Sequence, residues 1–247
     1  KVCLFQLPSF ELVDLHRFPT PTKWNGKESE FEMEKIWEGV KEGIHLLSQK
    51  VENPKEIKTI SIASAAQTIV LLDEHNQILE PTITWYDPRS QSEAELVYNI
   101  VGREELYSIT GIVSHSNHSL TKLLWIKDHF PNQYAKLKKW TCLSGFIAFK
   151  LSGAFVTDVS LASRTLLLDI STRNWSKKLM EYFGLSESSF PTIVESGKAH
   201  ALLNASLAIE VGLSPNTTIS IAGHDHMAGS ICTNLDVDKE ILNSTGT

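Results

Sequence analysis

The chain has 247 residues, of which 42% are hydrophobic and 21% are charged, and its formal net charge at pH 7 is −6. A chain of this length and composition can bury a core without disulfides or a structural metal, which excludes a disordered tail, a fibre and a small disulfide scaffold. The acidic balance, with no face dense in lysine and arginine, disfavours a nucleic-acid-binding protein. No apolar run reaches the about 18 residues of a membrane span, and Cys3, Cys142 and Cys232 form no disulfide or zinc motif. We therefore expect a cytoplasmic protein that binds neither membranes nor nucleic acids.

The predicted elements begin with a hairpin, in which apolar runs at residues 2–7 and 11–18 flank the turn residues Pro8 and Ser9. The clearest helix is predicted over residues 30–51, where apolar side chains recur every three or four positions. Ser29 is the expected N-cap of this helix, and Glu32 would complete a capping box. Both elements indicate core packing rather than chemistry.

The rest of the chain alternates between strands and helices. The predicted strands cover residues 59–64, 69–72, 78–83, 217–222 and 241–243. The predicted helices cover residues 92–101, 119–129, 144–151 and 175–183. This alternation indicates an α/β fold, and no repeat or linker divides the chain.

Four segments are more polar than their places in this pattern require. The first covers residues 223–229, directly after the strand predicted at 217–222. Ligands of open α/β sheets bind beyond the carboxyl ends of strands, so Asp225 is a candidate general base. It is equally suited to cap the helix that follows. His224, Asp225 and His226 could also hold zinc or iron, although adjacent residues rarely converge on one ion.

The other three segments have a structural and a functional interpretation each. Asp87 and Arg89 are spaced as in a turn whose two side chains pair, or as a charged site after a strand. Residues 114–119 are dense in donors and acceptors, which suits a polyhydroxylated ligand or a helix cap at Ser119. Residues 244–247 place small hydroxyl side chains around a glycine, a pattern that can present backbone N–H groups to a phosphate.

In this order and spacing the segments resemble the N-terminal domain of the FGGY family of carbohydrate kinases. The resemblance rests on W-x-D-x-R at 85–89, T-K-x-x-W at 121–125, T-D-x-x-x-A-S at 157–163, G-x-D at 223–225 and S-T-G-T at 244–247. It implies an actin-like, ribonuclease-H-like α/β domain, with a mixed sheet flanked by helices. It also implies an enzyme that phosphorylates a sugar or polyol hydroxyl with ATP and Mg²⁺.

The resemblance assigns roles to particular residues. Asp225 would be the catalytic general base. The expected sugar contacts are Gln67, Asp87, Asn117 and His226, and the residues expected to face the phosphates are Thr245, Gly246 and Thr247. Gln67 and the preceding Ala66 fall on a residue pair that contacts sugar hydroxyls in the family, and Ala66 cannot form a hydrogen bond through its side chain. Which sugar is bound, and which hydroxyl reacts, stay open.

The family also has a first strand with an Asp-x-Gly-Thr loop before the segment that matches Lys1, and a nucleotide-binding domain after S-T-G-T. We therefore expect residues 1–247 to be the sugar-binding domain without its first strand, inactive alone, and a homo-oligomer at full length. One alternative is a catalytically silent sugar-binding or regulatory protein of the same fold. Another is a metal-dependent hydrolase that uses His224, Asp225 and His226.

Overall fold

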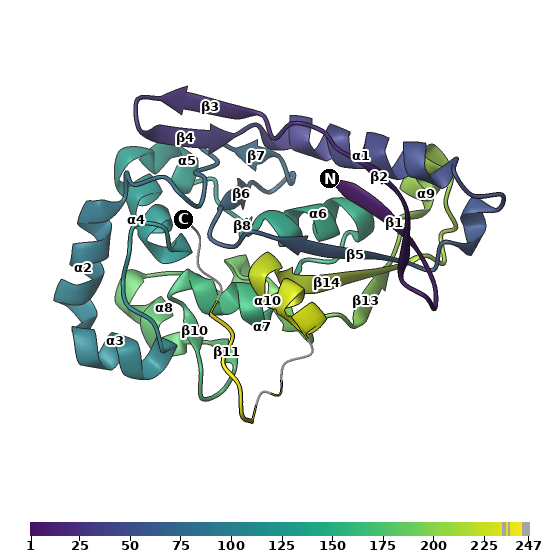
Figure 1. The fold of residues 1–247 in the computed structure, drawn as a ribbon. Coiled ribbons are helices and arrows are strands. Elements are labelled where there is room, and N and C mark those ends of the chain that lie inside the picture. Colours follow the sequence, from purple (N-terminus) through teal and green to yellow (C-terminus); the bar gives the residue numbers. More distant parts are fainter. Residues whose placement is uncertain (234–235, 237, 244–247) are drawn as a thin grey trace.

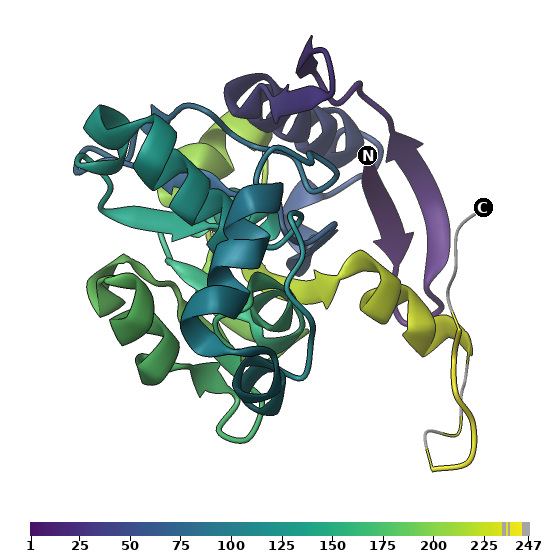
Figure 2. The ribbon, with the colours of Figure 1, turned by 90° about the vertical axis from the view of Figure 1, so that its left-hand side faces the viewer.

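The structure is a computed structural model that describes residues 1–233, 236 and 238–243 (Figure 1). Its N-terminal part is the predicted hairpin, formed by β1 (Val2–Gln6) and β2 (Glu11–His16) in antiparallel register. The hairpin is a sheet of its own that packs on α1 (Met33–Ser48). Figure 2 shows it at the margin of the molecule, apart from the other strands. Its outward apolar side chains are largely exposed, including Phe10 at 73%.

The predicted start of the first helix is wrong. Ser29 lies in β4 (Glu28–Phe31), which pairs with β3 (Thr22–Asn25), and α1 begins only at Met33. The N-cap position is taken by Glu32, whose side chain makes no capping hydrogen bond. Ser29 instead bonds with Thr84 through the two hydroxyls, at 2.6 Å. Pairing with residues distant in sequence outcompetes the local capping box here.

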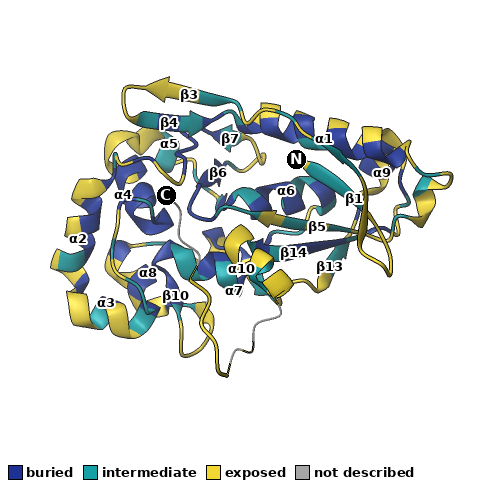
Figure 3. Cartoon of the chain, viewed as in Figure 1, coloured by how far each residue is buried: buried dark blue, intermediate teal, exposed yellow. Residues whose placement is uncertain are grey.

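The central sheet has the order β13–β14–β5, formed by Ala199–Leu202, Thr218–His224 and Thr59–Ser64. β14 runs parallel to β5 and antiparallel to β13, so the sheet is mixed. The strand predicted at 217–222 is therefore its middle strand, and Figure 3 shows β14 as largely buried. His224 is paired with Ser64, so β14 and β5 end side by side. The loops that leave these two strands start from the same edge.

Two hydrophobic cores hold the elements together. The first contains the inner face of α1 together with α6 (Leu143–Ser152), α9 (Ala205–Val211) and the apolar residues of β5 and β14. In Figure 1 α1 lies above the central sheet, with α9 beside it. The second core joins α2 (Gln91–Val101), α4 (Ser119–His129) and α8 (Lys177–Phe183) to the antiparallel sheet β7–β6–β8. That sheet is formed by Ile78–Leu79, Val70–Leu72 and Lys139–Thr141.

The remaining elements are short. The helices are α3 (Arg103–Thr110), α5 (Pro131–Tyr134), α7 (Val159–Ala162) and α10 (Asp225–Ser230), with single 3₁₀ turns η1 (Pro54–Glu56), η2 (Ser163–Thr165), η3 (Glu187–Ser189) and η4 (Ile231–Thr233). The strands pair as β9 (Val156–Asp158) with β12 (Thr192–Val194), and β10 (Leu168–Asp169) with β11 (Asn174–Trp175). The strand predicted at 241–243 is wrong, because these residues are irregular. Within the described ranges no helix is long and apolar enough to cross a membrane.

Candidate functional site

Asp225 lies where the buried strand β14 gives way to α10. It is the first residue of α10, and its Oδ1 accepts a hydrogen bond from the main-chain N–H of His226 at 2.8 Å. The side chain is 47% exposed. The structure therefore places this carboxylate directly after a strand, as the sequence predicted, and leaves about half of it exposed; its role as a general base stays a prediction.

His224 is the imidazole next to this carboxylate. Its Nδ1 lies 3.4 Å from Oδ1 of Asp225, but the two groups are not aligned for a hydrogen bond. Burial lowers the pKa of His224, and the positive charge of Arg164 lowers it further, while Asp225 acts in the opposite direction. Burial therefore favours the neutral form of the His224 ring.

The turn into Asp225 is held by the segment that carries Asp158 and Ser160. The hydroxyl of Ser160 accepts from the main-chain N–H of His224 at 2.8 Å and donates to Oδ2 of Asp158 at 2.7 Å. Asp158 is fully buried and also accepts from the hydroxyl of Ser196. Gly223 leaves space for this contact, because a Cβ there would lie 2.6 Å from Oγ of Ser160.

Gln67 lies three residues beyond the end of β5, in a strained turn. Its φ is +72°, and the N–H of Thr68 donates to the carbonyl of Ala66 at 2.9 Å, which closes a γ-turn around Gln67. The side chain is buried, with Nε2 3.2 Å from Nδ1 of His118. Strain of this kind is concentrated at ligand sites.

Lys122 connects the Gln67 turn to the loop that carries Asn117. Its ammonium donates to the main-chain carbonyls of Gln67, at 2.7 Å, and Asn117, at 2.9 Å. The whole side chain is buried, and this burial lowers its pKa to about 7. Two of the predicted sugar contacts are thus fixed to one another by a single buried side chain.

A cavity of about 440 Å³ opens beside Asn117. Its lining consists of Tyr107, Gly111, Ile112, Val113, His115, Asn117, His118 and Arg164. The ring nitrogens of His118 lie 2.9 Å from the carbonyl of Arg164 and 3.1 Å from that of Val113. Although both carbonyls favour the protonated ring, burial dominates and lowers the pKa of His118 to about 4.

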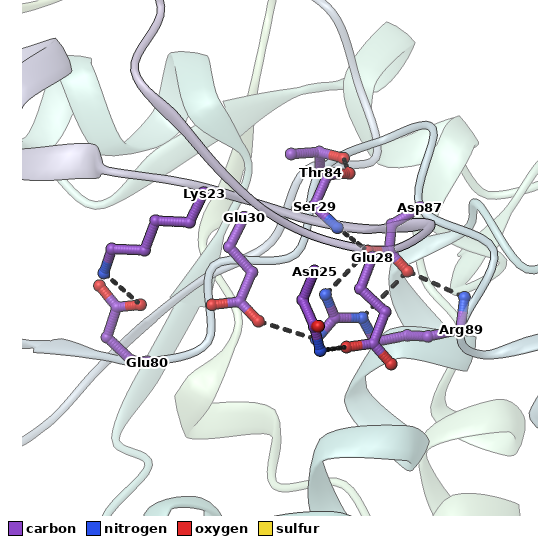
Figure 4. A network of polar contacts seen from close by, with 9 residues as sticks. All are labelled: Lys23, Asn25, Glu28, Ser29, Glu30, Glu80, Thr84, Asp87 and Arg89. Carbon is purple, nitrogen blue, oxygen red and sulfur yellow. Dashed lines mark hydrogen bonds and ion pairs between the residues drawn. The ribbon is translucent and has the colours of Figure 1, made fainter.

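Asp87 is placed differently from the other predicted sugar contacts. Its carboxylate is fully buried and accepts from the main-chain N–H of Ser29, at 2.5 Å, and from three N–H groups of Arg89 (Figure 4). Arg89 also donates to Glu30 at 2.8 Å and lies over the ring of Trp125. A carboxylate has about four acceptor positions, so a sugar hydroxyl would have to displace one of these donors.

The other predicted contacts are near α10 or outside the described residues. His226 is exposed, and its ring lies 5.5 Å from that of His224. Thr245, Gly246 and Thr247 fall outside the residues that the structure describes. Among the described residues, no group of three His, Cys, Asp or Glu side chains is placed to hold a metal ion. The hydrolase alternative therefore has no metal site within this part of the chain.

Comparisons with known proteins agree on one family. The sequence model described as "FGGY family of carbohydrate kinases, N-terminal domain" matches residues 11–232. An L-fuculokinase of Haemophilus influenzae is 27% identical over 241 residues, which are 95% of this chain and 51% of the relative. A xylulose kinase of Bacillus subtilis is 30% identical over 193 residues, 78% of this chain and 38% of the relative. The chain thus spans about half the length, or less, of these relatives.

Solved structures share the fold. The xylulose kinase of Rhodospirillum rubrum superposes with a TM-score of 0.88 at 21% identity, covering 94% of this chain and 48% of that one. A ligand-bound xylulose kinase of Lactobacillus acidophilus gives 0.86 at 23% identity, covering 94% and 47%. At these identities the likeness concerns the fold.

Proposed function

Because the chain belongs to the FGGY family of carbohydrate kinases, we propose that it is the sugar-binding domain of an enzyme that phosphorylates a sugar or polyol hydroxyl with ATP. Its fold is the actin-like, ribonuclease-H-like α/β fold of the structural neighbours. The observation that carries the proposal is Asp225, a half-exposed carboxylate at the end of a buried strand.

In the proposed reaction Asp225 acts on the hydroxyl that is phosphorylated. The hydroxyl oxygen forms a bond to the γ-phosphorus of ATP, the bond from that phosphorus to the bridging oxygen breaks, and ADP leaves. The hydroxyl proton passes to the carboxylate of Asp225. Because phosphoryl transfer depends mainly on positioning and charge stabilisation, this carboxylate need not be strongly basic.

The sugar would be held beside Asp225 by residues from separate loops. Gln67, on the strained turn after β5, and Asn117, at the cavity, are joined through Lys122. His226 would reach the same ligand from α10. Asp87 would contribute directly only if the sugar displaces one of its present donors, and otherwise acts by holding Arg89 and β4 in place.

The proposed contacts between this chain and ATP rest on the family resemblance. Thr245, Gly246 and Thr247 would face the phosphates of ATP. Magnesium commonly reaches such sites bound to the nucleotide phosphates. Among the described residues no three metal-ligating side chains lie together, so in the proposed reaction magnesium would arrive with ATP.

The test is Asp225→Asn in the full-length protein that contains these residues. The amide keeps the shape of the side chain but does not accept a proton, and loss of a general base lowers turnover by ~10²–10⁴-fold. The KM for the sugar should change far less. Asp128→Asn is the matched control, because Asp128 is 82% exposed at the end of α4. If Asp225→Asn turns over at nearly the wild-type rate, Asp225 is not the general base. If the wild-type protein phosphorylates no sugar at all, the alternative of a catalytically silent sugar-binding protein is favoured.

A further inference from the structure

His118 is a buried histidine whose ring faces three polar groups. Its Nε2 lies 3.1 Å from the main-chain carbonyl of Val113, and its Nδ1 lies 2.9 Å from that of Arg164. Nδ1 is also 3.2 Å from the amide nitrogen of Gln67, on the turn after β5. His118 is 3% exposed, and burial lowers its pKa to about 4, so the ring is neutral at pH 7 and carries a single N–H.

The position of this N–H follows from the three neighbours of the ring. On Nε2 it donates to the carbonyl of Val113, and the lone pair of Nδ1 accepts from the amide nitrogen of Gln67; the carbonyl of Arg164 then faces that lone pair. On Nδ1 it would satisfy the carbonyl of Arg164, but it would meet an N–H of Gln67 and leave a bare nitrogen against the carbonyl of Val113. The first arrangement has one unfavourable contact and the second has two, so the proton belongs on Nε2.

The amide oxygen of Gln67 is open to a ligand. The amide nitrogen bonds to His118, whereas Oε1 has no hydrogen-bond partner among the residues that the structure describes and is not sealed from solvent. Gln67 comes three residues after Ser64, the last residue of β5. Ser64 is paired with His224, which directly precedes Asp225. The free oxygen therefore belongs to the loop that leaves the sheet beside the candidate base.

We propose that His118 is a positioning residue, which holds the amide of Gln67 by its nitrogen so that the amide oxygen accepts a hydrogen bond from a hydroxyl of the sugar. This inference rests on the function proposed above and names a requirement that the site places on its substrate. A hydroxyl can donate to the amide oxygen, whereas a keto oxygen or a fluorine atom cannot. A site built to bond a hydroxyl rejects analogues that lack it, because its own polar group is left unpaired. The substrate therefore presents a hydroxyl, and not a carbonyl, to Gln67.

The test uses the full-length protein and whichever of glycerol, D-xylulose, L-fuculose and D-gluconate it phosphorylates fastest. Each hydroxyl of that sugar is replaced in turn by hydrogen or by fluorine, and ADP release gives kcat/KM. The hydroxyl that faces Gln67 is the one whose removal has no effect in Gln67→Ala. At that position we expect the deoxy and fluoro analogues to be equally poor substrates of the wild type, by about 2- to 13-fold, the range for one neutral hydrogen bond.

Variants of His118 separate positioning from folding. His118→Leu should reduce the preference for the parent sugar over its deoxy analogue and leave the KM for ATP unchanged. His118→Asn places an amide oxygen near the position of Nδ1, which can accept from Gln67, and should retain the preference. His75→Leu is the matched control, because His75 is 77% exposed.

Several results would overturn the inference. A fluoro analogue that reacts faster than the deoxy analogue would mean that Gln67 presents its N–H groups to the sugar. Equal losses for the parent and deoxy sugars in His118→Leu would give His118 a structural role only, and so would a panel in which Gln67→Ala abolishes the effect of no hydroxyl.

A spectroscopic measurement tests the inference without turnover. The ¹⁵N NMR spectrum of the protein labelled in histidine reports which ring nitrogen of His118 carries the proton, with the signals assigned by their loss in His118→Asn. A proton on Nε2 supports the inference, and a proton on Nδ1 contradicts it. If the wild-type protein phosphorylates none of the four sugars, the proposed function fails separately, and this spectrum still decides how His118 holds Gln67.

Discussion

The main-chain N–H of His224 donates a hydrogen bond to the hydroxyl of Ser160, 2.8 Å away on a different element. The hydroxyl in turn donates to the buried carboxylate of Asp158. This short chain of hydrogen bonds fixes the last residue of β14 just before Asp225. The orientation of the candidate base is thus set by the T-D-x-x-x-A-S segment, about 65 residues earlier in the sequence.

Ser160→Ala should lower both stability and turnover. The change leaves the N–H of His224 and one acceptor position of Asp158 without a partner, and a buried unsatisfied group costs ~1–3 kcal/mol. Urea unfolding of the full-length protein measures the loss. Ser108→Ala is the matched control, since the Ser108 hydroxyl bonds to a carbonyl on the exposed face of α3. Ser160→Thr keeps the hydroxyl and should therefore retain both stability and turnover. Equal stability of Ser160→Ala and Ser108→Ala would contradict the role of this bond.

Gly223→Ala should destabilise the protein more than an ordinary glycine substitution. The φ of Gly223 is +120°, and a Cβ there would lie 2.6 Å from Oγ of Ser160 and 3.1 Å from Oδ2 of Asp158. Backbone strain of this kind costs ~1–3 kcal/mol, and the steric clash adds to it. Gly153→Ala is the control, because Gly153 has a φ of +78° with nothing within 4 Å of the added Cβ. Thermal unfolding should show the larger loss at Gly223, and a larger loss at Gly153 would be the contrary result.

Lys122 should make stability depend on pH. Burial lowers its pKa in the folded protein to about 7 from a model-peptide value of 10.5. Between these two values the unfolded chain binds more protons than the folded one, so the contribution of Lys122 to stability rises with pH. Below pH 7 both states are protonated and the contribution is constant. We expect the stability of the wild type relative to Lys122→Met to increase from pH 7 to 9, by at most about 1.4 kcal/mol per unit.

The measurement is urea unfolding of both proteins across that pH range. Subtracting the Lys122→Met values removes the titration of all other groups. Lys177→Met serves as a control, because Lys177 is exposed on α8. A flat difference between wild type and Lys122→Met would show that the ammonium keeps its ordinary pKa when buried.

Arg89→Met should lower the free energy of unfolding more than most single substitutions in this chain. Arg89 supplies three donors to the buried Asp87 and one to Glu30. The substitution removes the two guanidinium bonds to Asp87 and leaves its charge buried, and breaking a buried pair in this way costs ~3–5 kcal/mol. Arg103→Met, at an exposed ion pair, should cost under about 1 kcal/mol. Chemical denaturation would show whether the two losses differ as stated.

Much of the fold follows from periodicity. The helix predicted over residues 119–129 is α4 with the same bounds, and the strand predicted over 59–64 is β5. The errors occur where distant residues decide the local structure. Ser29 lies in β4, where it forms hydrogen bonds with Thr84 and Asp87, and does not cap α1. Residues 241–243 have the composition of a strand but no strand partner among the described residues.

The candidate site, like the fold, could be predicted only where the signal is local in sequence. The position of Asp225 directly after a strand could be predicted, because a carboxylate that follows a run of β-branched residues is a local pattern. The chain from His224 through Ser160 to Asp158 could not, since it joins elements that only the fold brings together. Lys122 belongs to the T-K-x-x-W motif, but its burial is what lets it hold the Gln67 and Asn117 carbonyls, and the burial of a single lysine cannot be predicted from motif spacing.

Gln67→Ala should change the order in which sugars are preferred, as well as the overall rate. Gln67 sits in a γ-turn with a φ of +72°, its carbonyl is held by Lys122, and its amide lies 3.2 Å from His118. If the amide bonds to a sugar hydroxyl, its loss costs ~0.5–1.5 kcal/mol for sugars that present that hydroxyl and nothing for those that lack it. The measurement is kcat/KM for a panel of epimeric sugars and sugar acids. Gln67→Gly separates the loss of the amide from backbone strain at the turn, because glycine removes the side chain and also relieves the positive φ. The two variants should share one altered ranking of sugars, and a uniform loss across the panel would assign Gln67 a structural role only.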